Sequence, residues 1–345
     1  MSSRILSVQS HVAYGYVGGK AAVFPLQCLG YDVDVVHTVH YSNHAGYARS
    51  GGTKTSASEL KAIFESMEQN ELLNPSRLLT GYIPNAEALL AVQDLGAKLT
   101  AQNENLIYLL DPVMGDSGRL YVASDVIPVY RSMLSMSTII TPNWFEVETL
   151  TEIPLTSIDA LQQALTKLHV TYKVPHVVIS SIPLQPWLAS VLPTELRPDE
   201  GTEYLLCITS SCIDNNTSKA SFKSTVHAQI VPLLPGYFSG VGDLFSALLL
   251  GHYDPSSPPT GLPKAAAQAL GTTHAILTRT LEYSRSLPAE EQLSTDDERD
   301  IEEPLRKTRR MRGRELRLVQ SLDILTDRTE REMVKLDDFW DIELK

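Results

Sequence analysis

The sequence has few cysteines, no long apolar run at its start and no excess of basic residues, and each shortage excludes a class of protein. Its three cysteines, Cys28, Cys207 and Cys212, match no metal-ligand spacing, and their odd number suits no disulfide framework. The 29 Lys and Arg residues are outnumbered by 41 Asp and Glu, a formal charge of −12 that disfavours nucleic acid or a membrane as partner. The first residues contain neither a signal peptide nor a membrane span. We therefore expect a cytoplasmic protein, with the nucleus as an alternative location.

What is present is ordinary globular composition, with 43% hydrophobic and 20% charged residues, enough for a substantial core. Short, continuous apolar runs predict strands buried on both faces of a sheet, and helical patterns lie between them. Together they predict an α/β fold with a doubly wound, mostly parallel central sheet flanked by helices. The predicted strands are Arg4–Val8, Asp32–Val39, Arg77–Thr80, Leu106–Leu110, Thr138–Thr141 and His176–Ser180; the predicted helices are Gly19–Leu29, Ser56–Gln69, Asn85–Gln102, Trp144–Thr151, Ser157–His169, Leu244–His252 and Lys264–Arg285.

Two regions depart from this pattern. Residues 183–232 are rich in Pro, Ser, Thr and Asn and predict antiparallel edge strands joined by a variable loop. In residues 287–313 an acidic block precedes a basic block, which predicts a disordered, charged insertion within a single domain of residues 1–345. The basic block could instead be a targeting or interaction patch, an interpretation that the neighbouring acidic block disfavours.

A glycine-rich turn, Gly240-Val241-Gly242-Asp243, directly precedes an apolar helix. Glycines let the backbone approach a phosphate closely, and the start of a helix directs free N–H groups toward it. Such a turn can stabilise the charge on a transferring phosphoryl group. Asp243 could equally be an ordinary helix N-cap. The turn is neither a Walker A motif, which needs Gly-Lys-Ser/Thr, nor a dinucleotide fingerprint, which needs a third glycine.

Three further polar segments follow predicted strands, at the sheet edge where ligands bind in doubly wound folds. Asp111 and Asp116 in DPVMGD suit a hydrated Mg²⁺ bridging phosphate oxygens, although aspartates are also common in turns. Asn143 and Glu146 in TPNWFE either face phosphates and metal or form a capping box. Ser10 ends the first strand, before a glycine-containing turn into a helix.

The order of these segments is more specific than any one of them. The series QSHV, GYVGG, SNHAGY, TGY, DPVMGD, TPNWFE and GVGD resembles the signature of the pyridoxal kinase branch of the ribokinase superfamily. NxxE and GxGD mark the superfamily, whereas QSHV, SNH and TGY narrow the resemblance to this branch. The resemblance covers residues 4–285 and resumes at ELRLVQS, residues 315–321, and the charged insertion resembles those of fungal members.

This resemblance implies a transferase that phosphorylates the hydroxymethyl group of pyridoxal, pyridoxine and pyridoxamine in vitamin B6 salvage. ATP would be the phosphoryl donor, Mg²⁺ or another divalent cation and a monovalent cation such as K⁺ would be needed, and a homodimer is expected. Asp243 would be the catalytic base. The expected vitamer-binding residues are Ser10, Val17, Tyr41, His44, Ala45, Tyr82, Gly240 and Asp243. The expected ATP-binding residues are Asp111, Asn143, Glu146, Ser180, Ser181, Gly240, Val241 and Gly242, and the expected cation ligands are Asp111, Asp116, Thr141 and Glu146.

Two residues depart from the family pattern. Ala45 and Val241 each stand where relatives commonly carry a threonine. Losing one neutral hydrogen bond typically costs about 0.5–1.5 kcal/mol, so weaker substrate binding is expected, but no proton acceptor or metal carboxylate is lost. The alternatives are a hydroxymethylpyrimidine, sugar or nucleoside kinase of the same fold, or a catalytically quiet regulatory relative. The retained Asp111, Asn143 and Asp243 disfavour the regulatory alternative.

Overall fold

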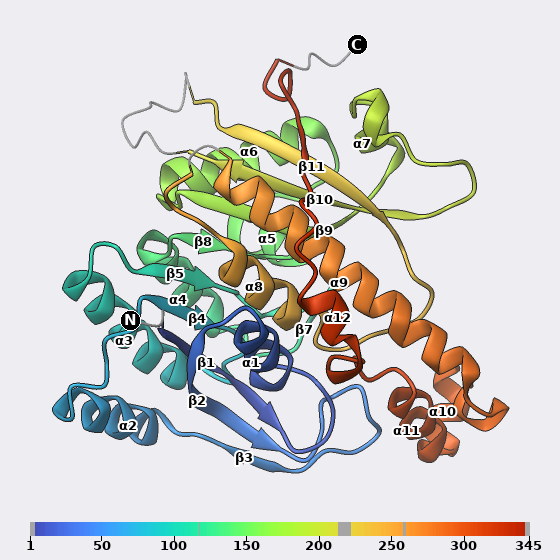
Figure 1. The fold of residues 1–345 in the computed structure, drawn as a ribbon, viewed down its shortest axis with the longest axis horizontal. Coiled ribbons are helices and arrows are strands. Elements are labelled where there is room, and N and C mark those ends of the chain that lie inside the picture. The colour runs from blue at the N-terminus through green and yellow to red at the C-terminus, as the bar shows by residue number, and fades with distance from the viewer. Residues whose placement is uncertain (1–3, 117, 213–221, 258–259, 342–345) are drawn as a thin grey trace.

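One sheet runs through the computed structural model, which describes residues 4–116, 118–212, 222–257 and 260–341 (Figure 1). Within these residues its strands are β1 (Arg4–Val12), β2 (Asp32–Tyr41), β3 (Gly52–Lys54), β4 (Arg77–Thr80), β5 (Ile107–Leu110), β8 (Ile139–Ile140), β9 (His176–Pro183), β10 (Tyr204–Ser211), β11 (Thr225–Pro232) and β12 (Val334–Lys335). They lie in the order β12-β11-β10-β9-β8-β5-β4-β1-β2-β3. Neighbours from β9 to β2 are parallel, and the strands at both edges pair antiparallel. The predicted fold class and the predicted antiparallel edge strands are confirmed.

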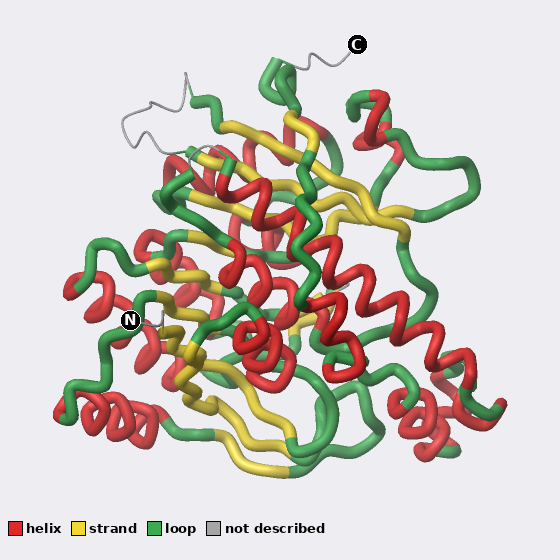
Figure 2. Tube along the Cα trace, in the orientation of Figure 1, coloured by secondary structure: helices red, strands yellow, loops and turns green. Residues whose placement is uncertain are grey.

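Helices cover both faces of this sheet (Figure 2). They are α1 (Gly19–Cys28), α2 (Ala57–Gln69), α3 (Ala86–Gln102), α4 (Val126–Met133), α5 (Trp144–Thr151), α6 (Ile158–Thr166), α7 (Pro186–Ala189), α8 (Val241–His252), α9 (Gly261–Ser286), α10 (Asp297–Glu302), α11 (Pro304–Arg312) and α12 (Leu322–Leu325). Helices α1, α8 and α9 pack on the face that Ile5 of β1 enters, and α2 to α6 pack on the face that Leu6 and Val8 enter. Strand β1 is therefore buried on both sides, as its sequence predicts.

Local signals explain most helix starts. Ser56 and Glu59 form a capping box before α2, and Asn85 and Ser157 accept backbone N–H groups at the starts of α3 and α6. Helix α4 was not predicted, although its buried residues recur at helical spacing. The assignment of residues 1–345 to one domain stays a prediction, and the shared sheet of β1 and β12 supports it.

The charged segment 287–313 differs from the disorder that its charge blocks predict. It contains a 3₁₀ turn (Ala289–Glu291) and the helices α10 and α11. Asp300 of α10 forms an ion pair with Arg310 of α11, and both side chains are at least 90% buried from solvent. The Arg310 guanidinium also donates to the carbonyl of Ser294, at 3.0 Å. The acidic and basic blocks therefore pair with each other in the structure instead of repelling within each block.

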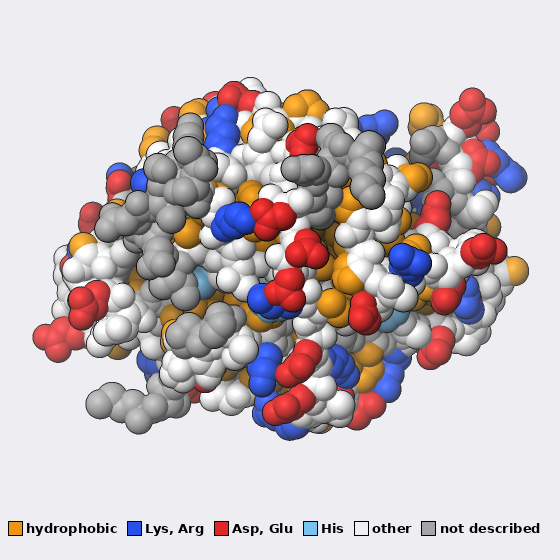
Figure 3. All heavy atoms as spheres, turned by 90° about the horizontal axis from the view of Figure 1, so that it is seen from above, with side chains coloured by type: hydrophobic (Ala, Val, Ile, Leu, Met, Phe, Trp, Pro, Cys, Tyr) orange, Lys and Arg blue, Asp and Glu red, His pale blue; other side chains and the backbone are white. Residues whose placement is uncertain are grey.

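The surface does not gather charge of one sign on the face shown in Figure 3, where Asp and Glu are interspersed with Lys and Arg. Among the described residues, no helix has the length and apolar content needed to cross a membrane.

The ion pair of Asp300 gives a test of order in the charged segment. Replacing Asp300 by Ala leaves Arg310 buried without its partner, a loss that typically costs about 3–5 kcal/mol. We expect trypsin to cleave within residues 299–312 at least roughly tenfold faster in this variant than in the wild type, because cleavage follows local opening. Asp323→Ala, which removes an exposed pair with Arg279, is the control. Equal, rapid cleavage of all three proteins would show that the segment is disordered.

Candidate active site

The carboxyl ends of the parallel strands bring most predicted site residues to one edge of the sheet. Ser10 lies in β1, and Tyr82 follows β4. Asp111 follows β5, Thr141 follows β8, and Ser180 lies in β9. Strand pairing places these five positions next to one another, because β1, β4, β5, β8 and β9 are consecutive in the sheet.

Asp243 lies in the first turn of α8 and is held by the loop after β1. The backbone N–H of Gly18 donates to Asp243 Oδ2 at 2.7 Å. Gly18 has a φ of 54°, and a Cβ there would lie 2.2 Å from Ser10 Oγ. Gly240, the N-cap of α8, has a φ of 78°, and its Cβ would lie 2.0 Å from the carbonyl oxygen of Tyr16. A side chain on Gly240 would separate the loop from the helix, and one on Gly18 would clash with Ser10 in β1, so both positions require glycine.

Asp111 and Thr141, two of the predicted cation ligands, both form hydrogen bonds with Ser246, one turn beyond Asp243 in α8. Ser246 Oγ donates to Asp111 Oδ2 at 3.1 Å and lies 2.8 Å from Thr141 Oγ1. All three side chains are buried. Sequence reasoning missed Ser246, although its spacing of three residues from Asp243 puts both on the same helix face.

Asn143 and Glu146 form the capping box that was one of the two predicted alternatives. Asn143 Oδ1 accepts the N–H of Glu146, and Glu146 Oε2 accepts the N–H of Asn143, each at 2.9 Å. Glu146 Oε1 also accepts the N–H of Met114 at 2.8 Å, which ties α5 to the DPVMGD turn. A role for either side chain at the phosphates stays a prediction.

Negative charge accumulates around these residues. Burial raises the pKa of Asp111 well above its usual range, and the charges of Glu146 and Asp243 raise it further. Burial also raises the pKa of Glu146 to about 7, although three backbone N–H groups oppose the shift. The pKa of Asp243 is raised by burial and lowered in part by the Gly18 N–H. Because burial and mutual repulsion destabilise the ionised carboxylates, a bound cation would stabilise them.

The other residues predicted to bind phosphate or metal lie in α8, in β9 and in the hairpin after β5. Gly242 is exposed, and a Cβ on it would meet nothing within 4 Å, so its backbone faces open space. Val241 lies beside it in α8, and Ser181 follows Ser180 in β9. Asp116 is exposed in the hairpin of β6 (Gly115–Asp116) and β7 (Arg119–Leu120), close enough for its charge to raise the pKa of Glu146.

Among the residues predicted to bind the vitamer, Tyr41 and Tyr82 lie close together, whereas His44 contacts a residue that was not predicted. Tyr41 and Tyr82 are neighbours: burial raises the pKa of Tyr82, and the charge of Tyr41 raises it further. Val17 lies beside Gly240, and Ala45 is exposed. The buried His44, in contrast, directs Nε2 toward Glu315, at 2.9 Å. Sequence reasoning missed Glu315, although ELRLVQS was part of the family resemblance.

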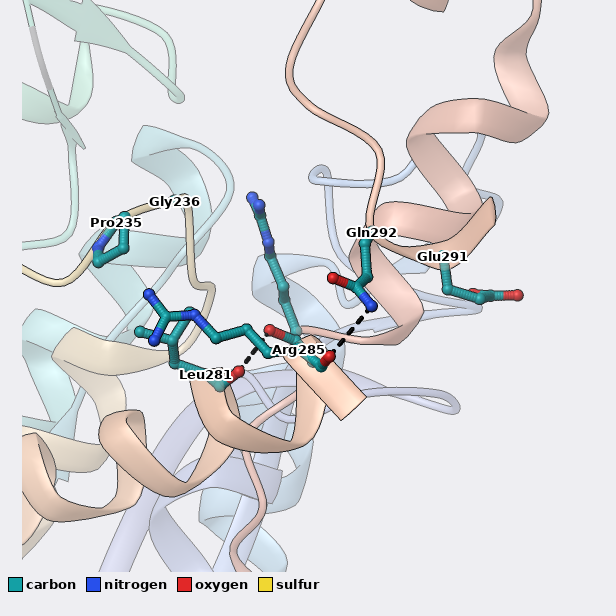
Figure 4. Close-up of a pocket in the computed structure, with 8 residues that line it drawn as sticks. Pro235, Gly236, Leu281, Arg285, Glu291 and Gln292 are labelled. Carbon is teal, nitrogen blue, oxygen red and sulfur yellow. Dashed lines mark hydrogen bonds between the residues drawn. The ribbon is translucent and has the colours of Figure 1, made fainter. Parts of the chain in front are cut away.

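A cavity of about 270 Å³ lies where the charged segment meets the loop before α8 (Figure 4). Pro235 and Gly236 line it from the loop, Arg285 from the end of α9, and Arg314 from the segment after α11. It contains none of the predicted site residues.

Comparison with known proteins agrees with the fold and the motifs. The family model described as phosphomethylpyrimidine kinase matches residues 31–192. The pyridoxal kinase of Arabidopsis thaliana is 39% identical over 83% of this chain and 85% of its own length. The human pyridoxal kinase is 33% identical over 87% of this chain and 96% of its own.

Solved structures extend this similarity to the fold. The pyridoxal kinase of Leishmania donovani in complex with ADP and pyridoxamine superposes with a TM-score of 0.76, at 28% identity, over 97% of this chain and 99% of that one. Its complex with ADP and pyridoxine superposes with a TM-score of 0.75. Because fungal, plant and animal relatives match similarly, at 33–39% identity, the fungal branch stays a prediction. With its ribokinase-like sheet, its ordered motifs and relatives of this identity over most of their length, the chain belongs to the pyridoxal kinase family.

Proposed function

We propose that this protein transfers the γ-phosphoryl group of ATP to the hydroxymethyl group of pyridoxal, pyridoxine and pyridoxamine. The observation that carries the proposal is the placement of Asp243, a partly buried carboxylate at the start of α8 whose Oδ2 accepts the N–H of Gly18, beside Ser10. The Leishmania donovani relative binds ADP together with pyridoxamine or pyridoxine, which supports both substrate classes.

Asp243 would accept the proton of the vitamer hydroxyl as the hydroxyl oxygen attacks the γ-phosphorus of ATP and ADP leaves. Gly18 already occupies Oδ2, so we assign Oδ1 as the proton acceptor. Burial raises the pKa of Asp243, which strengthens its carboxylate as a base. The transferring phosphoryl group would lie at the first turn of α8, where the exposed backbone of Gly242 and the helix N-terminus can stabilise its charge.

The acidic residues fit a divalent cation bound mainly through water and phosphate oxygens. Both oxygens of Glu146 already accept backbone N–H groups, so we propose that Glu146 holds the cation through water, and that the exposed Asp116 approaches it directly. The described residues hold no cluster of three or more His, Cys, Asp or Glu placed to ligate one ion, and Mg²⁺ commonly keeps several waters. Asp111 and Thr141 would lie near a monovalent cation. Bound cations would neutralise charge on the phosphates.

A second substrate class has one observation in its favour. The family model that matches residues 31–192 describes a phosphomethylpyrimidine kinase, so a hydroxymethylpyrimidine belongs in any substrate panel. We favour the B6 vitamers because relatives 33–39% identical, aligned over at least 83% of this chain, are pyridoxal kinases. A homodimer and a cytoplasmic location are further predictions of the family resemblance.

The base is tested by replacing Asp243 with Asn, which keeps size and polarity but removes the proton acceptor. We expect kcat with each vitamer to fall by about 100-fold or more, with the KM for ATP little changed. The measurement is ATP-dependent phosphorylation of pyridoxal, pyridoxine, pyridoxamine and hydroxymethylpyrimidine by wild type and variant. Near wild-type kcat in the variant would refute the assignment, and wild-type activity on the pyrimidine alone would refute the substrate class.

The raised pKa of Glu146 predicts a pH dependence of stability. Between pH 4.5 and about 7, Glu146 is ionised in the unfolded chain but still protonated in the folded one, so the free energy of unfolding falls as pH rises. Above about pH 7 this contribution is constant. In Glu146→Gln the fall should be smaller than in the wild type, and added Mg²⁺ should raise wild-type stability more at pH 8 than at pH 5. Urea unfolding at both pH values measures this. Parallel curves for wild type and variant would contradict it.

The exposed Ala45 tests the vitamer side. If it faces the substrate, Ala45→Thr adds one hydroxyl, which should lower the KM for pyridoxal roughly two- to tenfold, the equivalent of about 0.5–1.5 kcal/mol. The kcat and the KM for ATP should stay near wild type. Steady-state kinetics with each substrate varied in turn decide this. An effect on ATP alone, or on no vitamer, would show that residues 42–47 do not line the vitamer site.

A further inference from the structure

Glu315 lies two residues beyond the charged segment and contacts two segments of the N-terminal half that are predicted to bind the vitamer, the loop after β1 and residues 44–47. Its Oε1 accepts from Tyr47 Oη at 2.6 Å and from His44 Nε2 at 2.9 Å. Its Oε2 accepts from the backbone N–H of Tyr16 at 2.9 Å. The side chain is only 11% exposed. A buried carboxylate with three donors is costly to disturb, because any donor left unpaired keeps its desolvation penalty.

These contacts fix the proton positions on His44. The backbone N–H of Gly46 donates to His44 Nδ1 at 3.1 Å, so Nδ1 carries a lone pair. The neutral ring therefore carries its hydrogen on Nε2, which donates it to Glu315. Both ring nitrogens are thus engaged within the protein, and His44 has no nitrogen left to bond a vitamer. That His44 lines the vitamer site through its other ring atoms stays a prediction.

Two glycines are fitted around this group. Gly15 has a φ of 93°, and a Cβ there would lie 2.6 Å from each carboxylate oxygen of Glu315. A Cβ on Gly46 would lie 2.7 Å from His44 Cε1 and 3.1 Å from Met311 Cε, at the end of α11. The loop after β1, the segment after β2 and the end of α11 therefore meet around one carboxylate with no space for a further side chain atom.

The same loop leads to the reacting atoms. Tyr16 binds Glu315 through its N–H, its carbonyl contacts Gly240, and Gly18, two residues later, binds Asp243. On the other side, the Arg314 guanidinium packs against Gly236 in the loop before α8. Residues 314–315 therefore contact both loops that set the position of Asp243.

We propose that Glu315 is a positioning residue, which holds the loop 15–18 and the segment 44–47 in the arrangement that binds the vitamer beside Asp243. This inference rests on the proposed function. Glu315 contacts no residue predicted to bind ATP, so its loss should weaken vitamer binding and, through Gly18 and Asp243, lower kcat, with ATP binding little changed.

The test is Glu315→Gln, which keeps size but replaces one acceptor oxygen with an NH₂ group. Either orientation of the amide points this group at a donor, so at least one hydrogen bond is lost. We expect the KM for pyridoxal to rise roughly tenfold or more, as for the loss of a hydrogen bond to a charged group, with the KM for ATP within about twofold of wild type. Glu330→Gln, at an exposed glutamate, is the control and should match wild type.

A double-mutant cycle separates positioning from general damage. Tyr47→Phe removes one donor to the same oxygen, and in the combined variant its effect on the pyridoxal KM should be much smaller than in the wild-type background. Additive effects, wild-type kinetics in Glu315→Gln, or equal losses for ATP and pyridoxal would overturn the proposal. If Glu315→Gln does not fold, Tyr47→Phe alone decides, since an unchanged pyridoxal KM contradicts positioning. Failure of the wild type to phosphorylate any vitamer would instead refute the proposed function.

Discussion

The hydrogen bond from Gly18 to Asp243 is the contact on which the site depends. It joins the loop after the first strand to a helix 225 residues later in the chain. It requires Gly18 and Gly240, which adopt backbone conformations that other residues rarely adopt: a Cβ on Gly240 would meet the loop, and one on Gly18 would meet Ser10. Ser10, beneath Gly18, and the backbone amides of α8 are thereby brought to one place. The residues predicted to bind the vitamer and those predicted to bind phosphate meet at this junction.

Near that junction lie the carboxyl groups of Asp111, Glu146 and Asp243, and hydrogen bonds offset only part of the cost of burying their charge. Glu146 receives backbone N–H groups and Asp111 receives the Ser246 hydroxyl, but burial still raises the pKa of both carboxyl groups. Apolar side chains in place of Asp111 and Glu146 would avoid the free-energy cost of burying charge. That the protein keeps these carboxylates points to ligands that carry positive charge. Glu315 contrasts with them: burial would raise its pKa, but the donors His44, Tyr47 and Tyr16 hold that pKa below its usual range. The first group suits cations, and Glu315 suits a structural role.

Much of the fold could be predicted because the signals are local. The strand Arg77–Thr80 was predicted with its observed bounds, since the apolar or β-prone residues Leu78, Leu79 and Thr80 form a short run. The motif residues could be assigned to one edge because parallel strands end together. Two other features could not be predicted. Glu315 contacts His44 across 271 residues, and no local pattern reports such a contact. The fold of residues 287–313 depends on Asp300 pairing with Arg310, whereas charge counts describe only each block by itself.

The long separation between Glu315 and its partners has a consequence for the order in which the protein becomes competent during synthesis. At roughly 5–20 residues per second, the 271 residues between His44 and Glu315 take about 14–54 s to translate. During that interval the segment around His44 can pair within the growing sheet, but Tyr16, His44 and Tyr47 lack their common acceptor. The nascent chain would thus form most of its sheet before Tyr16, His44 and Tyr47 meet Glu315, so the segments predicted to bind the vitamer would be the last part of the site to be fixed.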